Sequence, residues 1–286
     1  MENKIVIITG ANSGIGLHTA VGLLKKGAHV IFACRSKERG NQAMLIAKAA
    51  SSSDKVSFLR CDLSSLRSIN EFVSAFTTKF NTLDVLINNA GVVTTRRKVT
   101  EDNFEQMIGV NHLGHFYLTH QLLPFLKRSS NGKVIHVSSG AHKWGNIYFP
   151  DPHLHRGFGI WKAYCQSKLA NILFSNRLAE QLLGTNVTSN ALHPGAVSTN
   201  IGVSRENGFG KSIHKLLRPL FLTPQEGAET SIYLASQSTN LLNGAYIADK
   251  QSVTFEGAAG DPVLAEKLWT WSEIEIEKNG FRLHVN

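Results

Sequence analysis

Tyr164 and Lys168 stand four residues apart, a spacing that would place a phenol and an ammonium on one face of a helix. A free phenol titrates near pH ~10, and a cation held beside it stabilises the phenolate and lowers the pKa. Such a pair could exchange a proton with a substrate oxygen near neutral pH. The pattern Tyr-x-x-x-Lys alone is common by chance. Whether this pair exchanges a proton therefore depends on which other residues the fold places beside it.

A glycine-rich loop follows the first apolar run of the chain, in the segment TGANSGIG. Its glycines would permit a tight turn, close approach of backbone to a pyrophosphate, and close packing of the next helix. The start of that helix offers free N–H groups to phosphate. The spacing GxxxGxG differs from GxGxxG, so a purely structural turn stays an alternative. The residues expected to contact the pyrophosphate are Gly10, Asn12, Ser13, Gly14, Ile15 and Gly16.

The end of the second apolar run indicates which dinucleotide would bind. An NAD site usually has an acidic residue ~20 positions beyond the glycines, to accept from the ribose 2′-hydroxyl. This sequence has Arg35 there, followed by Ser36 and Lys37. A guanidinium suits a 2′-phosphate bidentately, so the segment favours NADP(H), with an ordinary surface arginine as the alternative.

Two further polar segments follow the third and fourth apolar runs. Asp62, before Leu63, could accept a hydrogen bond from an adenine amino group. The run Asn88-Asn89-Ala90-Gly91 would let backbone pass close to the adenosine while its amides tie neighbouring strands together. Either segment could also be only a turn. The predicted contacts here are Asp62, Leu63, Asn88, Ala90 and Gly91.

The order of these segments resembles that of the short-chain dehydrogenase/reductase superfamily, over about residues 4–247. The resemblance rests on TGxxxGIG, NNAG, Asn111, the pair Ser138-Ser139, YxxxK and the segment His193-Pro194-Gly195. The finer strings ACR, VNHLGHF, YCQSKLAN and LHPG resemble the retinol dehydrogenase-like branch. Members of that branch mostly use NADP(H) on retinoids and other lipophilic aldehydes, and a carbonyl reductase of microbial type is the alternative.

The resemblance implies a role for each residue of the site. Tyr164 would be the general acid in carbonyl reduction, and Lys168 would lower its pKa and bind the nicotinamide ribose. Ser139, rather than Ser138, would hold the substrate oxygen, and Asn111 would anchor a proton-relay water. The residues implied along the nicotinamide and its phosphate are Pro194, Gly195, Val197 and Thr199.

Short apolar runs alternate with segments of helical period, as in a parallel sheet covered by helices on both faces. Strands are predicted over 5–9, 29–33, 56–60, 85–88, 133–137, 187–192 and 241–247. Helices are predicted over 15–26, 37–50, 68–80, 104–128, 163–183 and 224–236. We therefore predict an α/β chain, a single doubly wound Rossmann domain over 1–286 with a mostly parallel seven-stranded sheet. The long loops 140–160 and 198–223 are expected to border the substrate.

Composition narrows the partners. The net charge is +9, but the basic residues are scattered and no run of five or six like charges occurs, so we expect no nucleic-acid partner. No apolar stretch approaches ~18 residues, which predicts no membrane span. Three cysteines without a CxxC pair fit a reducing compartment. We expect a cytoplasmic protein that binds a small lipophilic carbonyl or alcohol, with homo-oligomerisation left open.

The sequence also contains features of other kinds of site. His112 with His115, or His153 with His155, could ligate a metal, but no HExxH motif or completing carboxylate accompanies them, and we predict no metal. A serine hydrolase would need GxSxG, which is absent from the sequence. The aromatic residues of the loop before Tyr164 could form a lid or only pack the loop; they are Trp144, Phe149, Phe158 and Trp161. A catalytically silent NADP(H)-binding sensor on the same fold is the alternative function.

Overall fold

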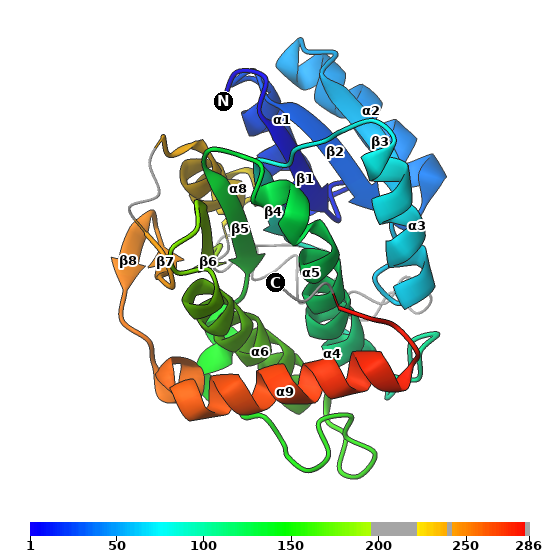
Figure 1. Ribbon diagram of the computed structural model, residues 1–286, viewed down its shortest axis with the longest axis vertical. Coiled ribbons are helices and arrows are strands. Elements are labelled where there is room, and N and C mark those ends of the chain that lie inside the picture. The colour runs from blue at the N-terminus through cyan, green and yellow to red at the C-terminus, as the bar shows by residue number, and fades with distance from the viewer. Residues whose placement is uncertain (196–221, 239–241, 284–286) are drawn as a thin grey trace.

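The centre of the molecule is a twisted sheet of eight strands in the order β3-β2-β1-β4-β5-β6-β7-β8 (Figure 1). This computed structural model describes residues 1–195, 222–238 and 242–283. The strands are β1 (Ile5–Thr9), β2 (His29–Cys34), β3 (Val56–Arg60), β4 (Val85–Asn88), β5 (Gly132–Val137), β6 (Val187–His193), β7 (Tyr246–Ala248) and β8 (Gln251–Val253). Strands β1 to β7 pair in parallel, and β8 pairs antiparallel with β7.

The doubly wound, mostly parallel α/β fold is therefore confirmed, while the predicted strand number of seven is too low by one. The seventh strand starts at Tyr246, later than expected, and the short strand β8 had no apolar alternation to reveal it. All three residues of β8 are exposed. The prediction of one domain over 1–286 extends to residues outside the described ranges and stays a prediction.

Helices cover both faces of the sheet, as Figure 1 shows. On one face lie α1 (Gly14–Leu24), α2 (Lys37–Ser51) and α8 (Pro224–Ser236), and on the other α3 (Leu66–Thr77), α5 (Gly114–Leu126) and α6 (Ile160–Gln181). Strand residues alternate between the two layers: Ile7 packs with α3 and α5, and Ile8 with α1. This alternation explains why the central strands β1, β2 and β4 are apolar over most of their length.

A π-helical turn interrupts the segment predicted as one helix over 104–128. The short helix α4 (Gln106–Ile108) runs into the π turn Gly109–Leu113, which continues as α5. Such turns widen the helix locally and are often found at functional sites. Asn111 lies in this turn.

The last helix of the described chain, α9 (Pro262–Lys278), was not predicted. It crosses the outer side of α6 and reaches towards α4 (Figure 1). Trp269 of α9 packs edge-on against Phe116 of α5, with ring centroids 5.1 Å apart. His112 of the π turn is 2.8 Å from the Ser272 hydroxyl. None of the helices described here is both long enough and apolar enough to cross a membrane.

Candidate active site

The glycine loop turns between β1 and α1 in the way its sequence predicts. Gly10 and Gly14 have positive φ angles, +67° and +55°, which strain other residues. A side chain at Gly16 would place its Cβ 2.6 Å from both the Gly10 carbonyl oxygen and Asn89 Nδ2, so only glycine fits. Each glycine thus meets a geometric requirement of the turn.

The start of α1 has the features of an anion site. Ser13 is its N-cap residue, and within the described structure its side chain makes no cap hydrogen bond. No acidic residue lies in the first turn of this helix. The first N–H groups of a helix lack partners inside the helix and carry partial positive charge. The loop with Asn12, Ser13 and Ile15 therefore fits a pyrophosphate.

Arg35 and Asp62 lie together where β2 and β3 end. The Cys61 N–H donates to the Cys34 carbonyl oxygen at 3.1 Å, which brings the two strand ends side by side. Arg35 Nε is 3.9 Å from Asp62 Oδ2, and the guanidinium is mostly exposed. Ser36 caps helix α2 by accepting from the Arg39 N–H. An exposed guanidinium held only loosely is free to meet a phosphate.

Ser139, Tyr164 and Lys168 come together from β5 and α6. Ser139 is the second residue after β5, and its hydroxyl lies close enough to the Tyr164 phenol to oppose the rise of the phenol's pKa. Lys168 Nζ donates to the Val137 carbonyl oxygen at 3.1 Å and lies 5.9 Å from the Tyr164 ring centroid. Ser138 instead donates to the Lys168 carbonyl oxygen at 2.7 Å. Of the two serines, Ser139 is the one whose hydroxyl reaches the phenol.

Burial shifts both titratable groups of this trio. It raises the pKa of Tyr164, and the hydrogen bond with Ser139 only partly opposes that shift. Burial lowers the pKa of Lys168 to about 8. In the chain by itself the cost of burying a phenolate thus raises the pKa of Tyr164. The expectation that Lys168 lowers this pKa stays a prediction.

Gly91 brings the backbone after β4 close to Lys168 and Asn111. A Cβ built on Gly91 would lie 3.5 Å from Lys168 Nζ and 3.7 Å from Asn111 Oδ1, both at van der Waals distance. A larger side chain at this position would therefore lie against the ammonium. The contact of Gly91 with the cofactor stays a prediction.

Asn111 is fully buried, and its side-chain amide is engaged at both ends. Its Oδ1 accepts from the Val92 N–H at 2.8 Å, and its Nδ2 donates to the Val92 carbonyl oxygen and to Ser167 Oγ. It therefore pins the chain after Gly91 against the π turn and α6. The proton-relay role of Asn111 stays a prediction.

His115 and Thr9 form a connection that we did not predict. His115 Nδ1 donates to the Asn111 carbonyl oxygen at 3.0 Å, which leaves Nε2 to accept from the Thr9 hydroxyl at 2.9 Å. The Thr9 oxygen also accepts from the N–H groups of Asn89 and Ala90. Burial lowers the pKa of His115 to about 4, so the ring stays neutral. One hydrogen-bonded chain thus joins the glycine loop to the π turn.

Some of the residues predicted to contact the cofactor have side chains that are buried in the protein interior. The Asn88 side chain is buried, and its Nδ2 donates to Thr119 Oγ1 of α5 at 2.9 Å. Leu63 is buried in the layer that holds α3 and α5. Ala90 packs closely against Gly10: a Cβ built on Gly10 would lie 3.1 Å from both the Cα and the Cβ of Ala90. For Asn88 and Leu63, a cofactor contact would therefore have to come from the backbone.

The end of β6 lies beside the segment that follows Ser139. Gly140 donates its N–H to His193 Nδ1 at 3.2 Å, a contact that the sequence did not reveal. Gly195, after Pro194, has φ +81°, and a Cβ there would lie 2.3 Å from Leu222 Cδ1. Val197, Thr199 and most of the loop predicted over 198–223 lie outside the described residues.

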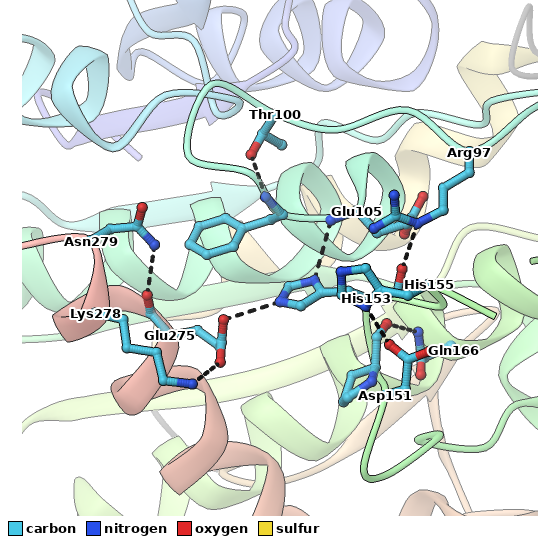
Figure 2. A network of polar contacts seen from close by, with 12 residues as sticks. Arg97, Thr100, Glu105, Asp151, His153, His155, Gln166, Glu275, Lys278 and Asn279 are labelled. Carbon is cyan, nitrogen blue, oxygen red and sulfur yellow. Dashed lines mark hydrogen bonds and ion pairs between the residues drawn. The ribbon is translucent and has the colours of Figure 1, made fainter.

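The loop before α6 is anchored by a network around His153, drawn in Figure 2. His153 Nδ1 accepts from the Glu105 N–H at 3.2 Å, so Nε2 carries the hydrogen and donates to Glu275 Oε2 at 3.1 Å. Arg97 Nε donates to the His153 carbonyl oxygen, and Phe104 stacks on the imidazole. One residue thus joins the loop, the segment before α4 and helix α9.

Gln166, two residues after Tyr164, holds the same loop from the side of α6. Its Oε1 accepts from the Tyr148 N–H at 3.0 Å, and its Nε2 donates to the Pro152 carbonyl oxygen at 2.8 Å. Gln166 is completely buried. The position of Tyr164 is therefore coupled to the loop 145–159.

The histidine pairs considered as metal ligands are used otherwise. Both ring nitrogens of His153 are engaged as described, and His155 Nδ1 lies 2.7 Å from Asp151 Oδ1. His112 and His115 are bonded to Ser272 and Thr9. Across residues 1–195, 222–238 and 242–283, no group of three or more His, Cys, Asp or Glu side chains is placed to hold a metal ion.

Comparison with known proteins agrees with this geometry. The family model described as short chain dehydrogenase matches residues 4–208. The mouse protein named retinol dehydrogenase 14 is 42% identical over 297 residues, which cover 96% of this chain and 86% of the relative. An uncharacterised protein from Mycobacterium paratuberculosis has a crystal structure with TM-score 0.79 and 33% identity, covering 99% of this chain and 96% of that one.

A solved structure with a cofactor is also similar. The active-site complex of Pseudomonas aeruginosa RhlG with NADP has TM-score 0.68 and 26% identity, and the match covers 86% of this chain and 94% of that one. The family model spans well over half of the sequence, and the mouse relative matches nearly all of it. The chain belongs to the short-chain dehydrogenase family, and within it to the retinol dehydrogenase-like members.

Proposed function

We propose that this protein is an NADP(H)-dependent oxidoreductase that interconverts a carbonyl and an alcohol on a small lipophilic molecule. The observation that carries the proposal is the grouping of the Ser139 hydroxyl, the Tyr164 phenol and the Lys168 ammonium behind Gly91. These groups supply a hydrogen-bond donor and a proton donor at one point, as carbonyl reduction needs. The relatives' name suggests a retinoid or a similar alcohol or aldehyde as the substrate.

The residues of this chain divide the work. The glycine loop and the start of α1 would bind the pyrophosphate, Arg35 the 2′-phosphate, Asp62 the adenine, and Lys168 the ribose. NADPH, when bound, supplies the hydride. Ser139 would hold the substrate oxygen, and Tyr164 would donate its proton to that oxygen. Because burial raises the pKa of Tyr164, the phenol holds its proton until the substrate takes it.

The state of the cysteines bears on the cell compartment in which the protein acts. All three cysteines, Cys34, Cys61 and Cys165, are free and buried. Free thiols are usual in reducing compartments, so we propose that the protein acts in the cytoplasm. Light scattering would determine whether the chain forms a homo-oligomer.

The test is the oxidation of NADPH with a panel of medium-chain and aromatic aldehydes, comparing the wild type with Tyr164→Phe. The substitution removes only the hydroxyl, so we expect folding and NADPH binding to persist while turnover falls ~100-fold or more. Near-full activity of the variant would show that Tyr164 is not the acid. Wild-type binding of NADPH without turnover of any panel member would favour a catalytically silent sensor.

A further inference from the structure

Two tryptophans lie exposed beside the tyrosine of the site. Trp144 is 66% exposed and Trp161 is 57% exposed, values unusual for the largest apolar side chain. Their ring centroids are 5.9 Å apart, and the Trp161 ring is 6.3 Å from that of Tyr164. Aromatic rings thus lead in two steps from the surface to the phenol.

The backbone fixes each tryptophan to one residue of the site. Trp144 ends the 3-10 helix Gly140–Trp144, which starts immediately after Ser139. Trp161 precedes Tyr164 by three residues on α6, so the two side chains lie on one helix face. Gly145 allows the two segments to approach closely, because a Cβ there would lie only 2.6 Å from the Cys165 carbonyl oxygen.

The neighbouring cations are directed to other partners. Lys143 pairs with Glu256 at 2.7 Å, and Lys162 lies 4.1 Å from the Tyr148 ring centroid. The inner side of Tyr164 is apolar as well. The residues packed together with Tyr164 there are Val92, Val93, Met107, Tyr148, Leu154, Phe158 and Ala163. Tyr164 thus packs with rings and aliphatic side chains, and its ring contact with Trp161 leads to the exposed tryptophans.

We propose that Trp144 and Trp161, the tryptophan pair, bind the hydrocarbon tail of the substrate whose oxygen lies at Tyr164. The pair would select compounds with an extended apolar chain over small aldehydes and alcohols. This inference rests on the proposed function, because it takes Tyr164 as the position of the reacting oxygen. The continuity of ring contacts from Tyr164 outwards assigns the occupant to the substrate.

Transfer of one methylene from water to an apolar surface favours binding by about fourfold when the methylene is fully buried. A tail that lies on two half-exposed rings gains less per methylene but extends over several. We therefore expect kcat/KM to rise with chain length once the tail reaches the pair. The gain should stop when the tail extends beyond Trp144.

The experiment measures kcat/KM with NADPH for straight-chain aldehydes from propanal to dodecanal. The quantity compared is the ratio of decanal to propanal in the wild type and in the double variant Trp144→Ser, Trp161→Ser. A ratio cancels any general loss of folded enzyme or of chemistry. We expect the ratio to fall at least 10-fold in the double variant. The control Val263→Ser, an exposed apolar residue at the start of α9, should keep the wild-type ratio.

A binding measurement makes the test independent of turnover. Decanol should shift the tryptophan emission of the wild type to shorter wavelength, because its tail replaces water at the exposed rings, and each single variant should lose part of that shift. An unchanged decanal-to-propanal ratio in the double variant, with unchanged decanol binding, would overturn the inference. Failure of the proposed function would give a different result: the wild type would turn over neither aldehyde, while the decanol-induced emission shift would still report binding at the tryptophan pair.

Discussion

Burial holds each of the two titratable groups of the site in a useful form. The pKa of Tyr164 is raised, so the phenol stays protonated at neutral pH, as a general acid must. The pKa of Lys168 is lowered to about 8, which still leaves most of the ammonium charged at pH 7. Both shifts come from the same cause, the removal of water around α6 and β5. Under the proposed function, both groups thus hold the protonation state that carbonyl reduction needs before a substrate binds.

Arg35 offers a prediction about cofactor choice. A charge-assisted hydrogen bond from its guanidinium to a 2′-phosphate should favour NADPH over NADH by about 1–3 kcal/mol. Arg35→Asp should reverse this preference, because a carboxylate repels the phosphate and accepts from a ribose hydroxyl. Dissociation constants for both cofactors, from NAD(P)H fluorescence, provide the measurement. Equal affinity of the wild-type protein for both cofactors would refute the assignment.

The buried ammonium of Lys168 predicts a dependence of stability on pH. A lysine titrates near ~10.4 in the unfolded chain and at about 8 in the folded one. Between these values the unfolded state holds more protons, so the contribution of Lys168 to stability rises with pH. Below pH 8 the folded state bears the full cost of the buried charge.

The measurement compares urea unfolding of the wild type and Lys168→Met from pH 7 to pH 10. The free energy of unfolding of the wild type, relative to the variant, should increase by on the order of 2 kcal/mol across this range. A constant difference would mean that Lys168 titrates alike in both states.

At the scale of elements, the sequence predicted the bounds of a strand or helix correctly where a clear local pattern marks the segment. Strands β1, β3 and β4 begin and end at the predicted residues. For β1 and β4 the reason is a nearly unbroken apolar run, which strands buried on both faces need. The capping box at Thr223 marks the start of α8 equally well. Helix α9 was missed because much of its apolar surface comes from tryptophans that are only partly buried.

The residues of the site also differ in whether the sequence alone predicts them. The glycine loop, Ser139, Tyr164 and Lys168 follow from motifs whose spacing is local. The link from Thr9 through His115 to Asn111 does not, because it joins residues about a hundred positions apart. The rise that burial causes in the pKa of Tyr164 does not follow from the motif either, because only the fold determines how much water the phenol loses.

Gln166 should couple the loop 145–159 to stability and activity. Gln166→Met removes the partners of the Tyr148 N–H and the Pro152 carbonyl oxygen while keeping the side-chain volume. Each unpaired buried polar group costs about 1–3 kcal/mol, so we expect a loss of at least 2 kcal/mol in urea unfolding and a lower kcat. The control Gln181→Met, at the exposed end of α6, should change stability by less than about 0.5 kcal/mol. Equal effects of the two variants would contradict a structural role for Gln166.

At the scale of the whole molecule, the cofactor site joins the carboxyl ends of several strands of one sheet. Ligand binding should therefore stabilise the described fold as a unit. NADPH at 100 times its dissociation constant should add about 2.7 kcal/mol, or roughly 5 °C or more in the thermal midpoint. NADH at the same concentration should add clearly less, and Arg35→Asp should exchange the two responses. Calorimetry with each cofactor measures both, and identical shifts would argue against NADP(H) selectivity.

Helix α9 has a consequence for the order in which the protein forms during synthesis. It covers α6, yet it follows α6 in the chain by about eighty residues, so it leaves the ribosome several seconds later at typical translation rates. Until then the Glu275 partner of His153 and the Ser272 partner of His112 are missing. The nascent chain can therefore build its glycine loop and the first strands of its sheet before α9 is available to support α6.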